Sequence, residues 1–433
     1  MLSRRSTLRT LIAATLAVAL IGTAFAHTFG TYEEKPFEGT TITVGLVGEP
    51  RSDALEAFLD EFFELTGITV NLDIQPYSTL QERQAISLTQ GQGAFDVVHV
   101  DTVWVGQYVE NGWVVSAEPF IEQTYPGTLE LDDISGALLE MLGVWEGEIF
   151  GLPFIQAVQG LYYRTDIFEE YGLEVPQTWE ELREVAAFIE ENVEGVHGVT
   201  WPGRRGVQLQ CTWDQMLWSF GGDWFDEDFN ATIDSPESLA AVEYLKSLLP
   251  YSVPGVLAYD YAETLEAFAQ GQAAMNIQWA NAAPSLVGSP VDGNWNFTAV
   301  PGLEQPDGSI YRAPTNGGWG LMVAHDARNP DAAWEFIVWA TTAEMERNLA
   351  HSGQGARVSV IEDPELQAQY IEYPGMLEAL EASVGRPRIP EYSELADALE
   401  VALSEALSGT RTVEAAMTAA NQQFEFILRR AGY

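Results

Sequence analysis

The sequence predicts an α/β protein built from two lobes, with a ligand cleft between them. The chain has 433 residues, too many for one hydrophobic core, and 46% of them are apolar, which excludes extensive disorder. Strand and helix signals alternate along residues 41–104, and a second alternating run follows Gly151–Phe168, whose sequence is GLPFIQAVQGLYYRTDIF. We interpret Gly151–Phe168 as the first segment that crosses from one lobe to the other.

The first run has the pattern of a parallel sheet covered by helices. Thr41–Val47 and Ile68–Ile74 are rich in β-branched and apolar residues, and Phe95–Val100 has the composition of a buried strand. Between these strands, helices are expected after the N-cap Ser52 and over Leu80–Thr89. The order strand, helix, strand, helix, strand is typical of parallel strands in one sheet.

Polar and aromatic residues follow the strands of this first run. In sheets of this kind, ligands bind outside the carboxyl ends of the strands. The residues that follow the first and third strands are therefore candidates for ligand contacts: Glu49, Arg51, Asp101, Thr102 and Trp104.

The second run begins after the crossing segment. Thr178–Glu181 has the pattern of a capping box and is expected to open an amphipathic helix. Another helix is expected to begin at Ser235-Pro236, and a third to cover Tyr261–Gln270. Ala273–Ile277 then has the pattern of a strand that leads to Trp279 in a loop.

The last part of the chain is expected to return to lobe one and to leave it again. Asn296–Val300 is predicted as a strand that leads back toward lobe one. Thr315–Gly320 is predicted as a loop that precedes the strand Leu321–Ala324. Further helices are expected after Asn329-Pro330, over Ser393–Leu407 and over Thr412–Arg430.

The charge of the chain is strongly negative, with 64 acidic residues against 20 basic ones and a formal net charge of -44. Such a surface repels nucleic acids and anionic lipids, so we expect neither as a partner. Only two of the basic residues, Lys35 and Lys246, are lysines. An acidic, lysine-poor exterior is typical of proteins from saline surroundings, where salt screens self-repulsion, and we state this habitat as a hypothesis.

Residues 1–26 have the pattern of an export signal. Arginines precede the apolar run Leu11–Ile21, and Ala24–Ala26 forms a small-residue cleavage site. The apolar run is shorter than the ~20 residues that a membrane-spanning helix needs. Arg4-Arg5 resembles a twin-arginine signal, although Thr7 replaces the usual aromatic residue, so the export route stays open. We therefore expect a periplasmic protein.

The sequence contains none of the common signatures of catalysis or metal binding. Its five histidines are scattered without a metal-binding spacing, so we expect no metal site and no cofactor. A GxSxG elbow and a Walker loop are missing as well. Cys211 is the only cysteine, and a buried apolar role is favoured over a reactive thiol. The paired carboxylates of a glycoside hydrolase stay open as an alternative, because 64 acids make accidental pairs inevitable.

The 13 tryptophans are a stronger signal, because many of them fall in predicted loops at strand ends. A sugar presents flat apolar C–H faces edged by hydroxyls, which an indole face and fixed polar groups can hold together. Trp179 and Trp334 lie in predicted helices, where core packing is the simpler interpretation. Five tryptophans with polar neighbours, together with Asp214 and Asn316, are candidates for the site: Trp104, Trp213, Trp224, Trp279 and Trp319.

Several motifs follow one another in a set order over most of the chain: GLPFIQAVQGLYYRTDIF, VPQTWEEL, AFAQGQAAMNIQWA, NGGWGLMV with NPDAAWEFIVW, and ARVSVIEDPEL. In this order and spacing the mature chain resembles the extracellular solute-binding proteins of ABC importers. The resemblance is to the carbohydrate-binding family that includes the maltose-binding proteins. It implies the two-lobed periplasmic-binding-protein fold of the class II type, with the lobes joined by crossing hinge segments, and no catalysis.

The resemblance also implies particular ligand contacts. Trp279 matches the stacking tryptophan of the family. The other matching positions are Gln156 and Gln159 in the crossing segment, Gly317, Gly318 and Trp319 in the cleft loop, Arg357, and the strand-end residues Glu49 and Asp101.

Residues 1–26 are thus predicted to be a signal peptide. Residues 40–153 and 302–352 are expected to form lobe one, and residues 154–301 and 353–433 to form lobe two. The expected function is to bind a mono- or oligosaccharide or a sugar alcohol in the cleft and to deliver it to the membrane permease of an ABC importer. We expect the protein to be a monomer. The alternative is a secreted carbohydrate-active hydrolase.

Overall fold

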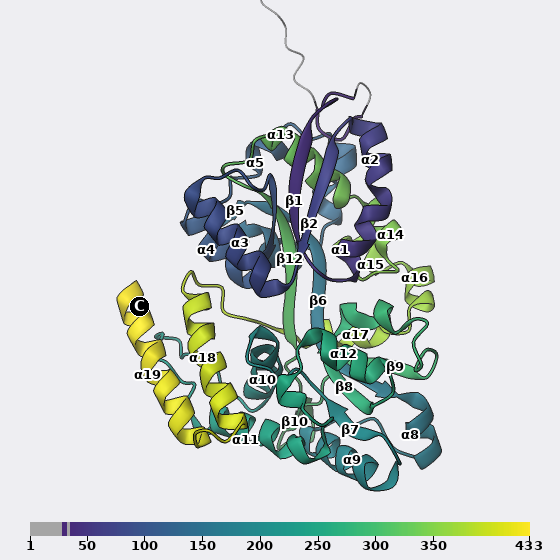
Figure 1. Cartoon of the computed structure of the whole chain (residues 1–433), viewed down its shortest axis with the longest axis vertical. Coiled ribbons are helices and arrows are strands. Elements are labelled where there is room, and N and C mark those ends of the chain that lie inside the picture. The colour runs from purple at the N-terminus through teal and green to yellow at the C-terminus, as the bar shows by residue number, and fades with distance from the viewer. Residues whose placement is uncertain (1–27, 33–34) are drawn as a thin grey trace, which may run out of the picture.

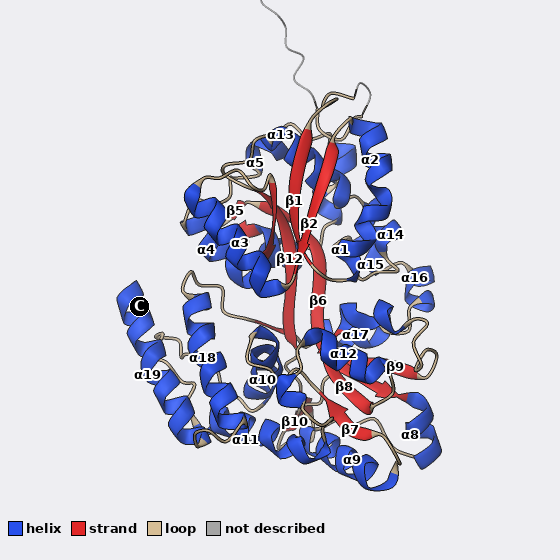
Figure 2. Ribbon diagram, viewed as in Figure 1, coloured by secondary structure: helices blue, strands red, loops and turns tan. Residues whose placement is uncertain are grey.

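The computed structural model describes residues 28–32 and 35–433, which form two lobes (Figure 1). The predicted signal peptide, residues 1–26, lies outside the described residues. Figure 2 shows strands running through the middle of both lobes with helices packed around them. No helix within the described ranges is both long enough and apolar enough to span a bilayer.

Within the described residues, nine strands form one sheet in the order β2-β1-β3-β12-β6-β8-β7, with β13 beside β12 and β9 beside β6. These strands are β1 Thr41–Val47, β2 Thr69–Gln75, β3 Val97–Asp101, β6 Gly151–Arg164, β7 His197–Thr200, β8 Ala273–Trp279, β9 Trp295–Ala299, β12 Thr315–Val323 and β13 Val384–Gly385. Two hairpins are separate from this sheet: β4 Val144–Trp145 with β5 Glu148–Ile149, and β10 Leu303–Glu304 with β11 Ile310–Tyr311.

Lobe one is built on β1, β2 and β3, which pair in parallel as the sequence predicts. The apolar side chains of β1 and all of β3 are buried, as expected for strands covered by helices on both faces. The helices of this lobe are α1 Pro50–Ala54, α2 Leu59–Thr66, α3 Tyr77–Gln90, α4 Val105–Glu110, α5 Glu118–Ile121, α6 Pro126–Leu129, α7 Gly136–Gly143, α13 Pro330–Ala340, α14 Ala343–Leu349 and α15 Val358–Ile361.

Lobe two is built on β7, β8, β9 and the second half of β6. Its helices are α8 Thr165–Tyr171, α9 Trp179–Asn192, α10 Val207–Ser219, α11 Pro236–Leu248, α12 Tyr261–Ala269, α17 Tyr373–Glu381, α18 Tyr392–Leu407 and α19 Val413–Ala431, and α16 Pro364–Gln369 leads into α17. The two last helices pack against each other and against α10 and α11 at one side of the molecule (Figure 1).

Strand β6 belongs to both lobes, which confirms that the segment beginning at Gly151 crosses between them. Its residues 151–158 pair with β12, whereas residues 159–164 pair with β8 on one side and β9 on the other. Because the partners change within one continuous strand, the two halves of the sheet are joined without a loop. Figure 1 shows β6 and β12 passing from the upper to the lower lobe.

Strand β12 differs from the expectation that Thr315–Gly320 forms a loop. The whole of Thr315–Val323 is a strand: residues 316–322 pair with β6, residues 319–323 with β3 and residues 315–316 with β13. Its glycines usually mark loops, but here they allow neighbouring backbone to come close. A Cβ at Gly318 would lie 2.5 Å from the Ile155 carbonyl oxygen, and one at Gly320 would lie 2.4 Å from that of Leu142.

Helix starts were predicted most reliably where a capping side chain is present. Thr178 and Glu181 form the expected capping box of α9, and Ser235 caps α11 with Pro236 in the first turn. By contrast, α3 begins at Tyr77, earlier than the expected Leu80, because Pro76 starts it without a side-chain cap.

Two sets of contacts bear on where the chain passes back between the lobes. The strand expected to lead back to lobe one, β9, pairs with residues 160–164 of β6 in lobe two. Near residue 353 the chain still contacts lobe one, where the Ser135 amide donates to the Ala356 carbonyl at 2.8 Å. We propose that the chain re-enters lobe one along β12 and leaves it after α15, so both boundaries lie beyond residues 302 and 353.

Gly160 lies at the point where β6 enters lobe two, and replacing it tests how tightly this crossing is packed. A Cβ there would lie 2.1 Å from Phe297 Cζ and 2.6 Å from the Thr298 carbonyl oxygen. Gly160→Ala is therefore expected to lower the free energy of unfolding by about 1–3 kcal/mol, measured by urea denaturation. Gly385→Ala is the matched control, since nothing lies within 4 Å of a Cβ at that strand position. Equal unfolding midpoints for Gly160→Ala and the wild type would contradict the prediction.

Candidate functional site

A cavity of about 800 Å³ lies between the lobes and receives residues from both. Its walls form where strands end: Glu49 follows β1, Asp101 is the last residue of β3, and Trp279 is the last residue of β8. The carboxyl ends of strands are the usual place for a ligand in α/β sheets. Three residues that are far apart in sequence thus face one enclosed space.

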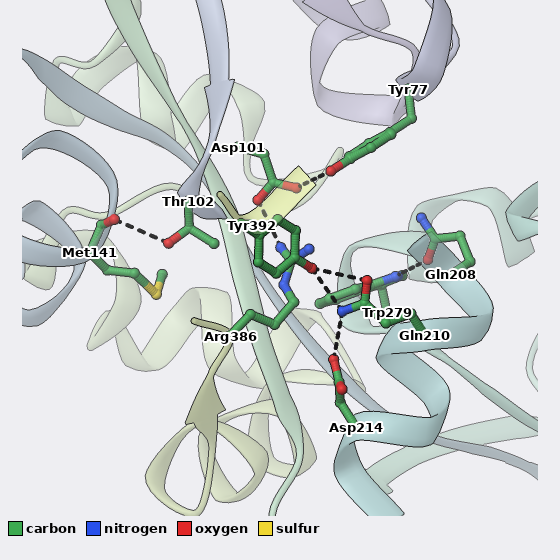
Figure 3. Close-up of polar contacts among 10 residues, drawn as sticks. All are labelled: Tyr77, Asp101, Thr102, Met141, Gln208, Gln210, Asp214, Trp279, Arg386 and Tyr392. Carbon is green, nitrogen blue, oxygen red and sulfur yellow. Dashed lines mark hydrogen bonds and ion pairs between the residues drawn. The ribbon is translucent and has the colours of Figure 1, made fainter. Parts of the chain in front are cut away.

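Trp279 forms the aromatic wall of lobe two. Its Nε1 donates to Gln208 Oε1 at 2.6 Å, and Gln208 lies in the first turn of α10 (Figure 3). Gly317 of β12 makes room for the ring, because a Cβ at that position would lie 3.1 Å from Trp279 Cη2. The hydrogen bond and the glycine together hold the indole in one orientation, with 7% of the residue exposed. A fixed indole suits the C–H face of a sugar or polyol.

Three aromatic side chains form the opposite wall in lobe one. Tyr77 lies with its ring centroid 4.8 Å from that of Trp104 and 5.5 Å from that of Trp319. Trp104 and Trp319 meet edge to face, with centroids 5.2 Å apart. All three line the cavity. Mutual packing therefore fixes their orientation before any ligand arrives.

A buried ion pair lies in the wall between these aromatic groups. Arg386 donates through Nη2 to Asp101 Oδ1 at 2.7 Å, and each side chain is only 3% exposed. The hydroxyl of Tyr77 donates to the other carboxylate oxygen at 2.8 Å (Figure 3). Burial alone would lower the pKa of Arg386, yet the adjacent Asp101 carboxylate reverses this effect and holds that pKa well above its ordinary value. The arginine thus stays charged in the cavity wall.

Glu49 joins the lobes at another part of the cavity. Asn281, in the short helix η6 (Ala280–Leu286) after β8, donates through Nδ2 to Glu49 Oε2 at 2.8 Å. Burial raises the pKa of Glu49 to about 8, against the opposing effect of Arg51. The carboxyl group is therefore mostly protonated at pH 7, and it can donate as well as accept a hydrogen bond.

Several polar atoms around the cavity have no partner among the described residues. They are Glu49 Oε1, Tyr261 Oη, Asn281 Oδ1 and Arg386 Nε. A buried polar atom without a hydrogen bond costs free energy, so such atoms usually meet water or a ligand. Their grouping around one cavity indicates a guest that offers several hydrogen-bonding groups.

Behind the wall lies a second polar layer, which explains three of the sequence candidates. The Gln210 amide donates to Asp214 Oδ2 at 2.8 Å and to the Tyr392 hydroxyl at 2.7 Å (Figure 3). Trp224 Nε1 donates to Asp214 Oδ1 at 2.8 Å, and its ring stacks on Tyr392. Burial raises the pKa of Asp214 to about 7, although both hydrogen bonds oppose this. Trp213 is fully buried in the core. These candidates support the wall from behind and do not line the cavity.

Other candidates also lie away from the cavity. Arg51 donates to the Gly353 carbonyl at 3.0 Å, and Arg357 donates to the Thr341 carbonyl at 2.7 Å. Both arginines are buried in lobe one, and burial lowers the pKa of each. Thr102 donates to the Met141 carbonyl at 3.1 Å (Figure 3). These contacts hold loops of lobe one together.

Of the sixteen candidates, the structure brings six to the cavity: Glu49, Asp101, Trp104, Trp279, Gly318 and Trp319. The other ten do not line it: Arg51, Thr102, Gln156, Gln159, Trp213, Asp214, Trp224, Asn316, Gly317 and Arg357. Gln156 and Gln159 are buried in β6, and Gly317 lies directly against Trp279. A role of any candidate in ligand binding stays a prediction.

Sequence reasoning missed several residues of the cavity: Tyr77, Gln208, Tyr261, Asn281, Arg386 and Tyr392. Two of them carried a usable signal, since Tyr77 follows a predicted strand and Asn281 follows the candidate Trp279 by two positions. Arg386 had none, because it reaches Asp101 from 285 positions away along the chain. In the described part of the chain, no three His, Cys, Asp or Glu residues gather as a metal site requires.

The chain matches the family model of the bacterial extracellular solute-binding proteins over residues 48–347, well over half its length. A probable amino-acid ABC transporter periplasmic-binding protein of Sinorhizobium fredii is 27% identical over 366 residues, which cover 82% of both chains. A mannitol-binding protein of Pseudomonas aeruginosa is 26% identical over 384 residues, which cover 82% of this chain and 85% of that protein.

A solved structure shares the two-lobed fold. It is an ABC transporter solute-binding protein of Agrobacterium radiobacter K84 in complex with ribitol, with a TM-score of 0.84 and 29% identity. The alignment covers 90% of this chain and all of that one. This likeness confirms the predicted two-lobed architecture, and the match over residues 48–347 confirms the predicted family. The chain belongs to the bacterial extracellular solute-binding proteins.

Proposed function

We propose that the protein binds a sugar or sugar alcohol in the cavity between its lobes and delivers it to the permease of an ABC importer. The observation that carries this proposal is the cavity itself, which is lined by an oriented indole and by residues with polar atoms that have no partner. One relative is named a mannitol-binding protein, and one structural neighbour was solved in complex with ribitol. The proposed location is the periplasm, and the proposed state is a monomer.

The chemistry of a polyhydroxyl ligand fits the two kinds of wall. The face of Trp279 offers apolar contact to a row of C–H groups. Arg386 Nε and the protonated carboxyl of Glu49 are donors, while Asn281 Oδ1 is an acceptor. Since each ligand hydroxyl can both donate and accept, one guest can satisfy all of these groups.

Closure of the lobes explains how binding can be coupled to a change of shape. Glu49 belongs to lobe one and Asn281 to lobe two, and their hydrogen bond spans the cleft. In the proposed mechanism the ligand first contacts one lobe, and closure about β6 and β12 adds the contacts of the other. Affinity then reflects the better contacts made in the closed form, which ligand binding favours.

The alternative of a secreted hydrolase gains no support from the cavity. A glycosidase needs one carboxyl group as an acid and a second as a base or nucleophile. Asp101 is held by Arg386 and Tyr77, and Asp260 and Asp397 lie beside Arg204 and Arg205. The family model and the relatives are those of binding proteins, and on this ground we propose that the protein has no catalytic activity.

Calorimetry of the purified mature protein against a panel of sugars, sugar alcohols and amino acids tests the proposed function. We expect saturable binding of one molecule of a sugar or sugar alcohol per chain, and no product when the same mixture is examined by chromatography. Binding of an amino acid alone, or turnover of a glycoside, would contradict the proposal.

Replacing Trp279 tests whether its indole face contacts the ligand. Trp279→Ala should weaken binding of the ligand found in the panel at least tenfold, about 1.4 kcal/mol, because the apolar wall is lost. Trp113→Ala is a matched control, since Trp113 is half-buried and lies outside the cavity. Thermal melting of both variants checks that they fold. Wild-type affinity in folded Trp279→Ala would remove this residue from the site.

The raised pKa of Glu49 predicts how affinity depends on pH. The protonated carboxyl group can donate to a ligand hydroxyl, so this contact is present below pH 8 and lost as the pH rises through 8. Wild-type affinity should therefore fall between pH 7 and pH 9. Glu49→Gln, whose amide donates at every pH, should bind with an affinity that changes little over this range. Parallel pH profiles for the two proteins would show that Glu49 does not act as a donor.

A further inference from the structure

The charged residues that line the cavity are unequally divided between acids and bases. The basic ones are three arginines, Arg204, Arg205 and Arg386, and lysine and histidine are missing from the lining. The acidic ones are six, namely Glu49, Asp101, Asp260, Glu263, Asp397 and Glu400. A ligand that enters therefore meets more negative than positive groups.

Each of these arginines is already paired with a carboxylate. Arg386 is bound to Asp101 inside the wall, as described above. Arg205 contacts Asp397 of α18 with an Nη2–Oδ1 distance of 2.6 Å.

Arg204 is shared between two acids at the start of α12. It contacts the Asp260 carboxylate and lies 3.9 Å from Glu263 Oε1. Every arginine of the lining thus has a carboxylate beside it, and an anionic group of a ligand would have to share its cation with that carboxylate.

The cavity also disfavours the ionised form of two of its own carboxyl groups. Burial raises the pKa of Glu49 to about 8, and that of Glu400 to about 7 with help from Asp397. A ligand carboxylate near these groups would meet the same loss of hydration and the same negative neighbours. The remaining free groups, Arg386 Nε and Asn281 Oδ1, are suited to hydroxyls.

Building on the proposed function, we propose that the cavity selects uncharged polyhydroxyl ligands and rejects those that carry a carboxylate or a phosphate. A bound anion would have to share an arginine that already has a carboxylate partner, in a lining with six acids against three arginines, and like charges at close range repel each other. Rejection of anionic ligands thus arises from arginines that already have carboxylate partners and from the excess of acidic residues in the cavity lining. The inference extends to amino acids, whose carboxylate also needs a cation.

Matched pairs of ligands test this selectivity. Each pair has one carbon skeleton in a neutral and an acidic form: ribitol and ribonate, mannitol and mannonate, sorbitol and gluconate, glucose and glucuronate. Calorimetry at pH 7 and low ionic strength should give a dissociation constant at least 30-fold higher for the acid of any pair whose neutral form binds. An acid that binds as tightly as its neutral partner, or alone, would overturn the selectivity while leaving solute binding intact. Binding of no neutral member would overturn the proposed function and, with it, this inference.

A variant that frees one arginine tests the cause. Asp397→Asn leaves Arg205 without its carboxylate, and Asp397 is exposed, so the fold should persist. The ratio of the acid to the neutral dissociation constant should fall at least threefold relative to the wild type. Glu243→Gln is the control, because Glu243 is exposed and lies outside the cavity, and it should keep the wild-type ratio. An unchanged ratio in Asp397→Asn would contradict the role of the paired arginines.

Discussion

The antiparallel pairing of β6 with β12 is the constraint on which the rest of the molecule depends. These two strands run through both lobes, and their outer partners, β8 beside β6 and β3 beside β12, carry residues of the cavity in a fixed register. Trp279 lies opposite Gln159 of β6, and Trp319 of β12 lies opposite Asp101. A shift of one residue would turn these side chains to the other face of the sheet. The site is therefore a consequence of strand register as much as of the residues themselves.

Glycine makes this pairing possible. The Cα of Gly151 comes so near β12 that a Cβ would lie 2.4 Å from the Leu321 carbonyl oxygen, and Gly318 and Gly320 are equally restricted. Gly317 leaves the space that the ring of Trp279 occupies. The glycines that lower strand propensity in this segment thus allow both the crossing and the aromatic wall.

Buried charge is the second organising feature, and it contrasts with the exterior. The chain carries a net charge of -44, yet the groups that shape the cavity are an ion pair, a protonated glutamic acid and neutral amides. Ion pairing and proton uptake keep the net charge of the inner wall low. A low net charge at the inner wall suits the capture of an uncharged solute.

The sequence was most informative where one local rule, the position of a residue at the carboxyl end of a strand, determines whether it lies near the cavity. Glu49, Asp101 and Trp279 lie at strand ends and line the cavity, because the carboxyl ends of strands meet there. Arg51 and Thr102, which were predicted at the same strand ends, do not line it. The rule failed where long-range packing decides. Trp213 lies on α10, a helix buried almost on every side, and Trp224 is held by Asp214 and Tyr392 behind the wall. Nothing in the local sequence distinguishes these tryptophans from one in a cleft.

Arg386 is the opposite case: it lines the cavity, but no local sequence pattern predicts it. It comes to Asp101 because the segment between α17 and α18 pairs with β12 through β13, directly before Arg386. Such a contact depends on the path of the whole chain, which single-sequence patterns do not encode. The prediction of a loop at Thr315–Gly320 failed for a related reason, since this segment is a strand through its pairing with the distant strands β3, β6 and β13.

A crystal structure of the protein with the sugar alcohol or sugar that binds it best is the most direct test of the account. We predict that the ligand lies between the lobes, with its carbon chain against Trp279 and its hydroxyls within hydrogen-bonding distance of Glu49, Asn281 and Arg386. A ligand that contacts a single lobe, or that lies outside the cavity, would contradict it.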